Sequence, residues 1–210
     1  MTGDIIDFNL NDSTIIRIAS NIKIELLNCC EDITMYLLKN DKTYLLTISP
    51  LQEDIFILKS ALKKALQNQF SLHPSINQDI GILWNQCLQC KPGLTYKKLE
   101  KRNSWVGLSY LLWGYGELAT WIYNDADGNI VLHITPVYRN KWEDNEEDDD
   151  EEANDLAYKE WMATEYKPLL TTILSPDIAQ AWLNQAEHIF WKLRDIQGLI
   201  DFDKRRAQID

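Results

Sequence analysis

His133 stands in a strand-like run, between Leu132 and Ile134 and on the opposite face from both. An imidazole in this position can exchange protons with a carboxylate such as Glu117 or Asp125. However, the chain contains only three histidines, and its pattern places no nucleophile beside this one. We therefore expect His133 to face solvent or an interface. A small enzyme with a pocket formed by His133 and these carboxylates is the alternative.

Cys87 and Cys90 have the CxxC spacing found in metal sites and redox motifs. A zinc site would need two more ligands, and the adjacent residues Cys29 and Cys30 are poorly placed to point at one ion. No histidine has zinc-finger spacing, and a thioredoxin-like role lacks the preceding strand. Four cysteines are too few for a disulfide scaffold in 210 residues. We therefore expect reduced thiols, no metal and no cofactor.

An acidic run over residues 143–152 dominates the charge of the chain, with nine acids in ten positions. The other 23 of the 32 acids nearly balance the 21 basic residues, so the folded body lacks the basic face that duplex nucleic acid requires. The run is either a solvated loop or a flexible charged segment that attracts a basic protein partner. We expect it to be mobile and dispensable for folding. Its candidate binding residues are Glu143, Asp144, Glu146, Glu147, Asp148, Asp149 and Asp150.

Trp191 is the second candidate for partner binding. At about 100° per residue it lies roughly opposite Trp182 on a predicted C-terminal helix, among polar residues. A tryptophan on a polar helix face either packs against a second layer or serves as a binding anchor. The sequence therefore predicts a binding surface of Trp191 with Glu187, His188 and Asp195.

The composition is typical of a globular protein, with 45% hydrophobic residues in a length sufficient for one well-buried domain or two small ones. Residues 1–8 carry acids where a signal peptide has basic residues, and no apolar stretch approaches the ~18 residues of a membrane-spanning helix. We expect a soluble, cytoplasmic protein without a membrane partner.

Alternating apolar residues predict strands in both halves of the chain, with tight turns at Asn40-Asp41 and Asp127-Gly128. In the first half, the predicted strands cover about 14–19, 21–28, 33–39 and 42–48. In the second half, they cover about 105–113, 118–124 and 129–138.

Apolar residues at helical spacing predict two helices after each set of strands. In the first half, these helices cover about 50–70, with Ser49 as the cap, and about 76–90. In the second half, one helix extends to Leu170, although Pro168 must shorten or kink it. The final helix begins with Ser175 as its cap and Pro176 at its first position.

The two halves of the chain are weakly similar to each other. An offset of 86 positions aligns residues 31–51 with 117–137 without a gap, and six of the 21 pairs are identical. A second match, of residues 79–84 with 177–182, needs an offset of 98. The 12 additional positions are about the length of the acidic run. This pattern predicts a duplication with the run as an insertion in the second copy.

These patterns predict an α+β fold with two antiparallel β-meanders, each followed by two helices, and an internal pseudo-duplication. Residues 1–92 and residues 93–210, with the insertion at 143–152, form the two halves of one compact unit. The favoured function is non-enzymatic binding of a basic protein partner, as an immunity or inhibitor-type protein or a chaperone-like escort. The alternatives are the enzyme described above and an oligomerising structural module that forms a homodimer.

Overall fold

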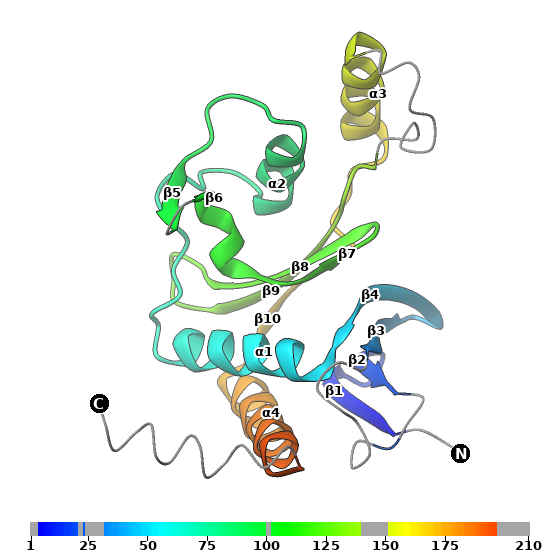
Figure 1. The fold of residues 1–210 in the computed structure, drawn as a ribbon, viewed down its shortest axis with the longest axis vertical. Coiled ribbons are helices and arrows are strands. Elements are labelled where there is room, and N and C mark those ends of the chain that lie inside the picture. The colour runs from blue at the N-terminus through cyan, green and yellow to red at the C-terminus, as the bar shows by residue number, and fades with distance from the viewer. Residues whose placement is uncertain (1–3, 21–22, 24–31, 100–101, 140–150, 197–210) are drawn as a thin grey trace.

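The computed structural model describes residues 4–20, 23, 32–99, 102–139 and 151–196, which form a mixed α+β fold with antiparallel sheets (Figure 1). The first sheet has the strand order β1-β2-β3-β4. Its strands are β1 (Ile5–Asn11), β2 (Thr14–Ala19), β3 (Asp32–Lys39) and β4 (Lys42–Pro50). The predicted turn at Asn40-Asp41 is confirmed, because both residues adopt the positive φ that a two-residue hairpin requires.

The first strand of this sheet differs from the prediction. β1 was not predicted, although its residues alternate between buried and exposed positions as a half-buried strand does. The strand predicted at about 21–28 falls almost entirely outside the described residues.

The second sheet has the strand order β10-β9-β8-β7. Its strands are β7 (Leu111–Tyr115), β8 (Leu118–Asn124), β9 (Ile130–Pro136) and β10 (Leu170–Leu174). The residues before it form the hairpin of β5 (Tyr96–Leu99) with β6 (Arg102–Trp105) and a 3-10 helix at Val106–Tyr110, so the strand predicted at 105–113 is wrong in its first half. The hairpin at Asp127-Gly128 is confirmed, and Gly128 has a φ of +83°.

In the described part of the chain, four α-helices connect or follow these strands: α1 (Leu51–Leu66), α2 (Ile80–Leu88), α3 (Glu151–Thr164) and α4 (Pro176–Ile196). The predicted cap of α4 is confirmed, because the Ser175 hydroxyl accepts a hydrogen bond from the N–H of Ile178 at 3.3 Å. The predicted cap of α1 is wrong: Pro50 occupies the cap position, and Ser49 donates to the Asp54 carboxylate instead. The helix predicted to reach Leu170 ends at Thr164, because the chain beyond it pairs with β9.

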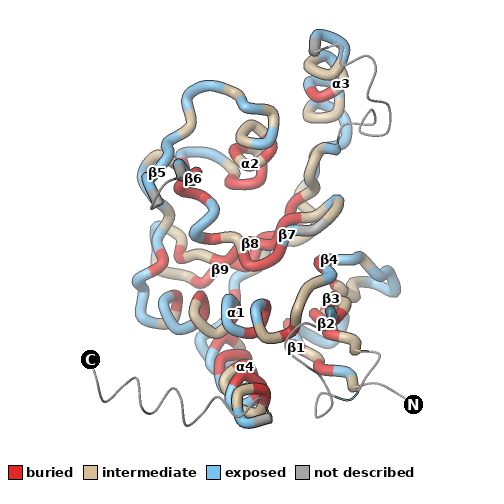
Figure 2. The backbone as a smooth tube through the Cα atoms, in the orientation of Figure 1, coloured by how far each residue is buried: buried red, intermediate tan, exposed pale blue. Residues whose placement is uncertain are grey.

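The two halves are joined by their longest helices. α1 packs against β7 and β8 of the second sheet, whereas α4 packs against β1 of the first sheet and against α1. Trp182 of α4 contacts Phe8 edge to face at 5.4 Å, and its indole N–H donates to the carbonyl of Asn9 at 2.9 Å. Buried residues occur in both halves (Figure 2), and most of the hydrophobic ones belong to a single cluster.

The sequence repeat and the strand order in the sheets give two different matches between the strands of the first half and those of the second half. The offset of 86 positions aligns β3 with β8 and β4 with β9. Counting strands from the start of each sheet pairs β3 with β9 and β4 with β10. In addition, α3 lies between β9 and β10, so within the described residues β10 is followed by α4 alone, whereas the first sheet is followed by α1 and α2.

Asp54 is a carboxylic acid buried in the first turn of α1. Burial raises its pKa to about 6, although the hydrogen bond from Ser49 acts in the opposite direction. A carboxyl group that binds its proton more tightly in the folded state contributes stability at low pH. This stability is lost as the pH rises from the unfolded value near 4 to about 6.

We therefore expect the stability of Asp54→Asn, relative to that of the wild type, to increase as the pH rises. Relative to the wild type, its free energy of unfolding should increase by about 1.4 kcal/mol between pH 5 and pH 7.5. Urea unfolding at both pH values measures this difference. Glu53→Gln, on the exposed side of the same turn, is the matched control. An equal pH dependence in Asp54→Asn and the wild type would contradict the prediction.

Candidate functional site

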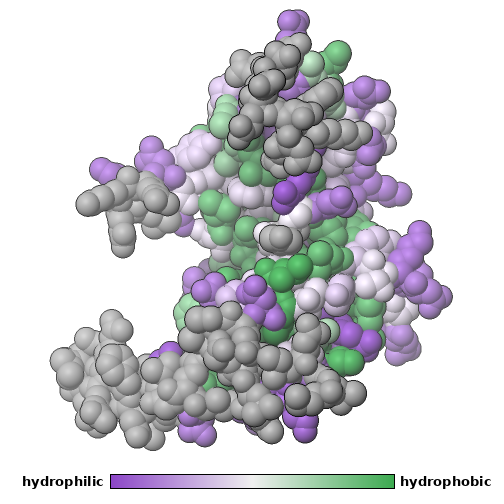
Figure 3. Space-filling view, turned by 45° about the vertical axis from the view of Figure 1, so that its right-hand side comes forward, coloured by the Kyte–Doolittle hydropathy of each residue, from purple (hydrophilic) through white to green (hydrophobic). Residues whose placement is uncertain are grey.

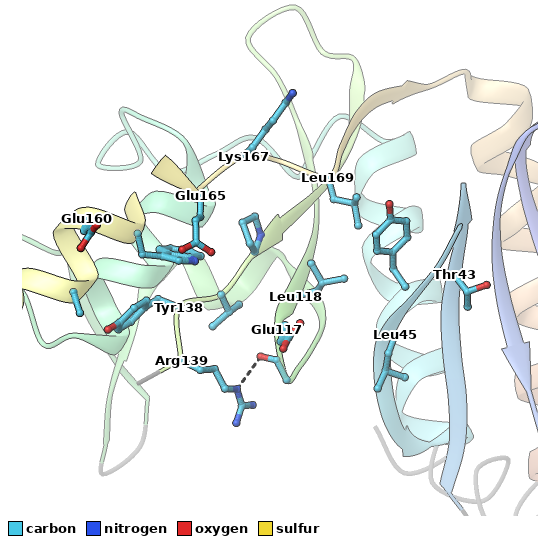
Figure 4. A pocket seen from close by; sticks show the side chains of 16 residues that line it. Thr43, Leu45, Glu117, Leu118, Tyr138, Arg139, Glu160, Glu165, Lys167 and Leu169 are labelled. Carbon is cyan, nitrogen blue, oxygen red and sulfur yellow. Dashed lines mark hydrogen bonds between the residues drawn. The ribbon is translucent and has the colours of Figure 1, made fainter. Parts of the chain in front are cut away.

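A groove of about 1130 Å³ runs between the first sheet and the second half of the protein. One wall comes from β4, and the other comes from the β7–β8 turn, the end of β9, α3 and the segment after α3 (Figure 4). Figure 3, in which the right-hand side of Figure 1 is turned forward, shows hydrophobic residues at the surface across the middle of the molecule. The lining residues are Thr43, Tyr44, Leu45, Gly116, Glu117, Leu118, Pro136, Val137, Tyr138, Arg139, Ala157, Glu160, Trp161, Glu165, Lys167 and Leu169.

The charged residues of the groove do not all face its interior. The carboxylates of Glu117 and Glu165 lie among the other lining side chains, whereas the Lys167 side chain extends away from them (Figure 4). The Arg139 guanidinium donates to the carbonyl of Gly116 at 3.1 Å. Glu117 and Glu165 are both exposed, so the groove presents solvent-accessible carboxylates beside its apolar walls.

α2 and α3 hold the aromatic wall of the groove in place. Buried Asn85 of α2 donates to the carbonyl of Pro136 at 3.0 Å and accepts from the N–H of Tyr138 at 2.6 Å. The Tyr138 ring lies 5.4 Å from that of Trp161, and its hydroxyl donates to Asn154 of α3. These contacts fix the backbone after β9 and the position of α3 on it.

His133 on β9 is buried, with 3% of its surface exposed. The expectation that it faces solvent or an interface is therefore wrong. Its carboxylate partner is Asp79, whose Oδ2 lies 3.0 Å from Nε2, and not Glu117 or Asp125. Its Nδ1 lies 2.8 Å from the hydroxyl of Thr171 on β10.

Asp79 connects three elements through its carboxylate. Oδ1 caps α2 by accepting from the N–H groups of Gly81 and Ile82, and it also accepts from the Tyr166 hydroxyl at 2.6 Å. Burial acts to raise the pKa of Asp79, but the hydrogen bonds from His133 and Tyr166 outweigh it and lower the pKa to about 2. Burial, together with Asp79, raises the pKa of Tyr166.

The hydroxyl of Thr171, the imidazole of His133 and the carboxylate of Asp79 have the order of an acid–base relay. None of these three residues lines the groove. Their contacts join α2 to β9, β10 and the segment after α3, so the cluster acts as a clamp within the fold. Asp79 could have been recognised in the sequence as the cap of an apolar helix, but its pairing with His133, 54 residues away, could not.

Trp191 lies on the outer face of α4 with 49% of its surface exposed, so the described residues form no second layer over it. Its ring contacts Phe190, which in turn lies beside Phe56 of α1. The ammonium group of Lys59 sits 3.7 Å from the Phe190 ring centroid and 5.6 Å from that of Trp191. His188 and Asp195 are exposed on the same helix, and Glu187 is partly buried.

Of the two predicted binding features, the structure describes the Trp191 surface and only the last two residues of the acidic run. Residues 143–150 of the acidic run lie outside the described part of the chain, and Glu151 and Glu152 begin α3. α3 and the C-terminal end of α4, which carries Trp191, lie at opposite ends of the longest axis of the molecule (Figure 1). The groove, by contrast, includes residues of α3 itself.

Comparison of the chain with protein-family models, with curated proteins and with solved structures found no significant match. Within the described ranges, no helix has the length and apolar character needed to cross a membrane. The described residues also contain no group of three or more side chains suited to hold a metal ion.

Proposed function

We propose that this protein binds another protein by accepting a basic, extended segment of it in the groove between the two sheets. The observation that carries this proposal is the placement of Glu117 and Glu165 among apolar lining residues. The binding would be non-enzymatic, as in an immunity or inhibitor-type protein or a chaperone-like escort.

Lysine and arginine side chains match such a groove in two ways. Their aliphatic stems can cover apolar residues such as Leu118 and Leu169, while their charged heads reach the carboxylates. An arginine or lysine over the Trp161 ring would also gain a cation–π contact. The acidic run, which leads directly into α3, would attract the same basic segment from a distance and speed its association.

We also propose that the two halves derive from one unit of four strands and a helix, with β1–β4 and α1 equivalent to β7–β10 and α4. The consecutive strand order in both sheets supports this pairing, which differs by one strand from the pairing given by the offset of 86 positions. A superposition of residues 5–66 on residues 111–196 that matched fewer than three strands would contradict it.

The groove can be tested with two synthetic peptides of equal length, one alternating arginine with leucine and the other glutamate with leucine. We expect the basic peptide to bind more tightly, and Glu117→Gln with Glu165→Gln to weaken its binding about tenfold, or roughly 1.4 kcal/mol. Fluorescence anisotropy at low ionic strength measures both affinities. The double variant Asp12→Asn with Glu53→Gln is the control, because it removes the same charge from exposed positions elsewhere. If both double variants weakened peptide binding equally, the loss of net charge would explain the effect, and binding in the groove would be contradicted.

The natural partner can then be identified by a pull-down from the native host with the wild type and the groove variant. Against that partner, Trp191→Ala reports whether the outer face of α4 also belongs to the interface. A central anchor should lose about 2 kcal/mol through faster dissociation, without a change in protein stability. Binding that Trp191→Ala leaves unchanged would exclude this face. The absence of a partner, together with Thr171-dependent hydrolysis of an activated ester, would favour the enzyme alternative.

A further inference from the structure

We propose that Cys87 and Cys90 form a reversible disulfide with each other, so that the C-terminal end of α2 is a thiol-oxidation site whose state affects α3. This inference is independent of the binding function. It starts from the CxxC spacing, which neither the groove nor the clamp around His133 uses.

The helix end brings the two cysteines together. The N–H of Cys90 donates to the carbonyl of Cys87 at 3.1 Å, and the N–H of Lys91 donates to the carbonyl of Gln86 at 2.9 Å. This pair of bonds defines a Schellman motif, with Cys87 in the last helical turn and Cys90 just past the end. The first and last residues of such a turn have Cα atoms within about 7 Å, close to the range that a disulfide spans.

The backbone of Cys90 is unusual for a residue with a side chain. Its φ is +52°, in the left-handed region where helices generally place glycine after their last turn. A cysteine here carries a conformational cost that glycine would avoid. Strained positions of this kind are often associated with function, and a bond to Cys87 gives this side chain a role.

The two thiols differ in accessibility, which sets the order in which they react. Cys90 is exposed, whereas Cys87 is partly buried, with its Sγ 3.7 Å from the hydroxyl of Tyr96. Burial raises the pKa of the Cys87 thiol, although the hydrogen bond with Tyr96 acts to lower it. Cys90 is therefore the accessible thiol, and Cys87 is suited to react second.

The chemistry needs a small-molecule disulfide as the oxidant. The thiolate of Cys90 attacks one sulfur of that disulfide, forming a mixed disulfide and releasing one thiolate. The thiolate of Cys87 then attacks the sulfur of Cys90, forming the intramolecular bond and releasing the second thiolate. Two cysteine thiols are oxidised, one disulfide is reduced, and the two protons pass to the released thiolates.

The position of the turn links this reaction to the wall of the groove. The ammonium group of Lys91 forms an ion pair with Asp155 of α3, and the amide oxygen of Gln89 accepts a hydrogen bond from Asn154. Gln89 and Lys91 directly flank Cys90 in the chain. A new bond at Cys90 therefore acts on the two residues that attach α2 to α3.

The test uses the full chain with Cys29→Ser and Cys30→Ser, so that Cys87 and Cys90 are its only thiols. Oxidised glutathione should remove two hydrogens from the mass without leaving a stable adduct, and reduced glutathione should reverse the change. On the same background, Cys87→Ser should retain one glutathione, because its mixed disulfide at Cys90 cannot be resolved. A stable glutathione adduct on the two-thiol protein, or no reaction at all, would overturn the disulfide.

Hydrogen exchange of α3 tests the link to the groove. We expect the amides of residues 151–164 to exchange at different rates in the oxidised and the reduced two-thiol protein. Cys90→Ser, treated with the same oxidant, is the control for effects of glutathione elsewhere in the chain. Identical exchange of α3 in the two states would overturn the link between the cysteines and this helix.

Discussion

Replacing Asp79 with alanine is expected to lower the free energy of unfolding by about 3–7 kcal/mol. The substitution removes the cap of α2, which contributes about 1 kcal/mol in typical helices. It also leaves the buried His133 imidazole and the Tyr166 hydroxyl without their acceptor, and each unpaired group costs about 1–3 kcal/mol. Urea unfolding at pH 7 measures the change.

Two further variants distinguish the loss of the hydrogen bonds made by Asp79 from a general effect of removing a carboxylate. Asp79→Asn keeps an oxygen acceptor and should be less destabilising than alanine. Asp127→Ala, at an exposed turn position, should change the stability by no more than about 0.5 kcal/mol. A loss below about 1 kcal/mol in Asp79→Ala would show that the cluster is not a clamp.

The lowered pKa of Asp79 also predicts the direction of its pH dependence. A carboxyl group whose pKa is about 2 when folded contributes stability above its unfolded value near 4. This contribution is lost as the pH falls from about 4 toward 2. The stability difference between the wild type and Asp79→Asn should therefore shrink in that range.

Trp182→Ala is expected to lower the free energy of unfolding by about 3–5 kcal/mol and to destabilise both halves together. The ring is buried, with 3% of its surface exposed, and it joins α4 of the second half to Phe8 and Asn9 of the first. Because α1 and α4 each pack against the sheet of the other half, neither sheet retains its cover when this contact is lost.

Unfolding followed by tryptophan fluorescence and by far-ultraviolet circular dichroism measures this cooperativity. The two signals should coincide in a single transition in the wild type and in Trp182→Ala. Trp191→Ala is the matched control, nine positions further along the same helix but half exposed, and should cost less than about 1 kcal/mol. Two separate transitions would contradict one cooperative unit and favour two independent domains.

The features that could be predicted correctly from the sequence depend on residues that are close together in the chain. The turn at Asn40-Asp41 and the cap at Ser175 require only a few adjacent residues. The outward position of Trp191 follows from helical periodicity, since Trp182 defines the buried side. β8 was predicted at its observed position because it lies beside a strong hairpin signal.

Features that join residues distant in the sequence depend on how the elements pack. The sequence of β10 was predicted to continue a helix. It forms a strand because it pairs with β9, and the local sequence does not reveal this pairing. The burial of His133 could not be predicted, because its hydrogen-bonding partners Asp79 and Thr171 come from other elements. Tyr166, which donates a hydrogen bond to Asp79, comes from a further segment of the chain. The groove combines residues 43–45 with residues 157–169, so its charge and shape exist only after the two halves pack. Burial and polar pairing depend on the whole fold, whereas turns and caps depend on local backbone geometry.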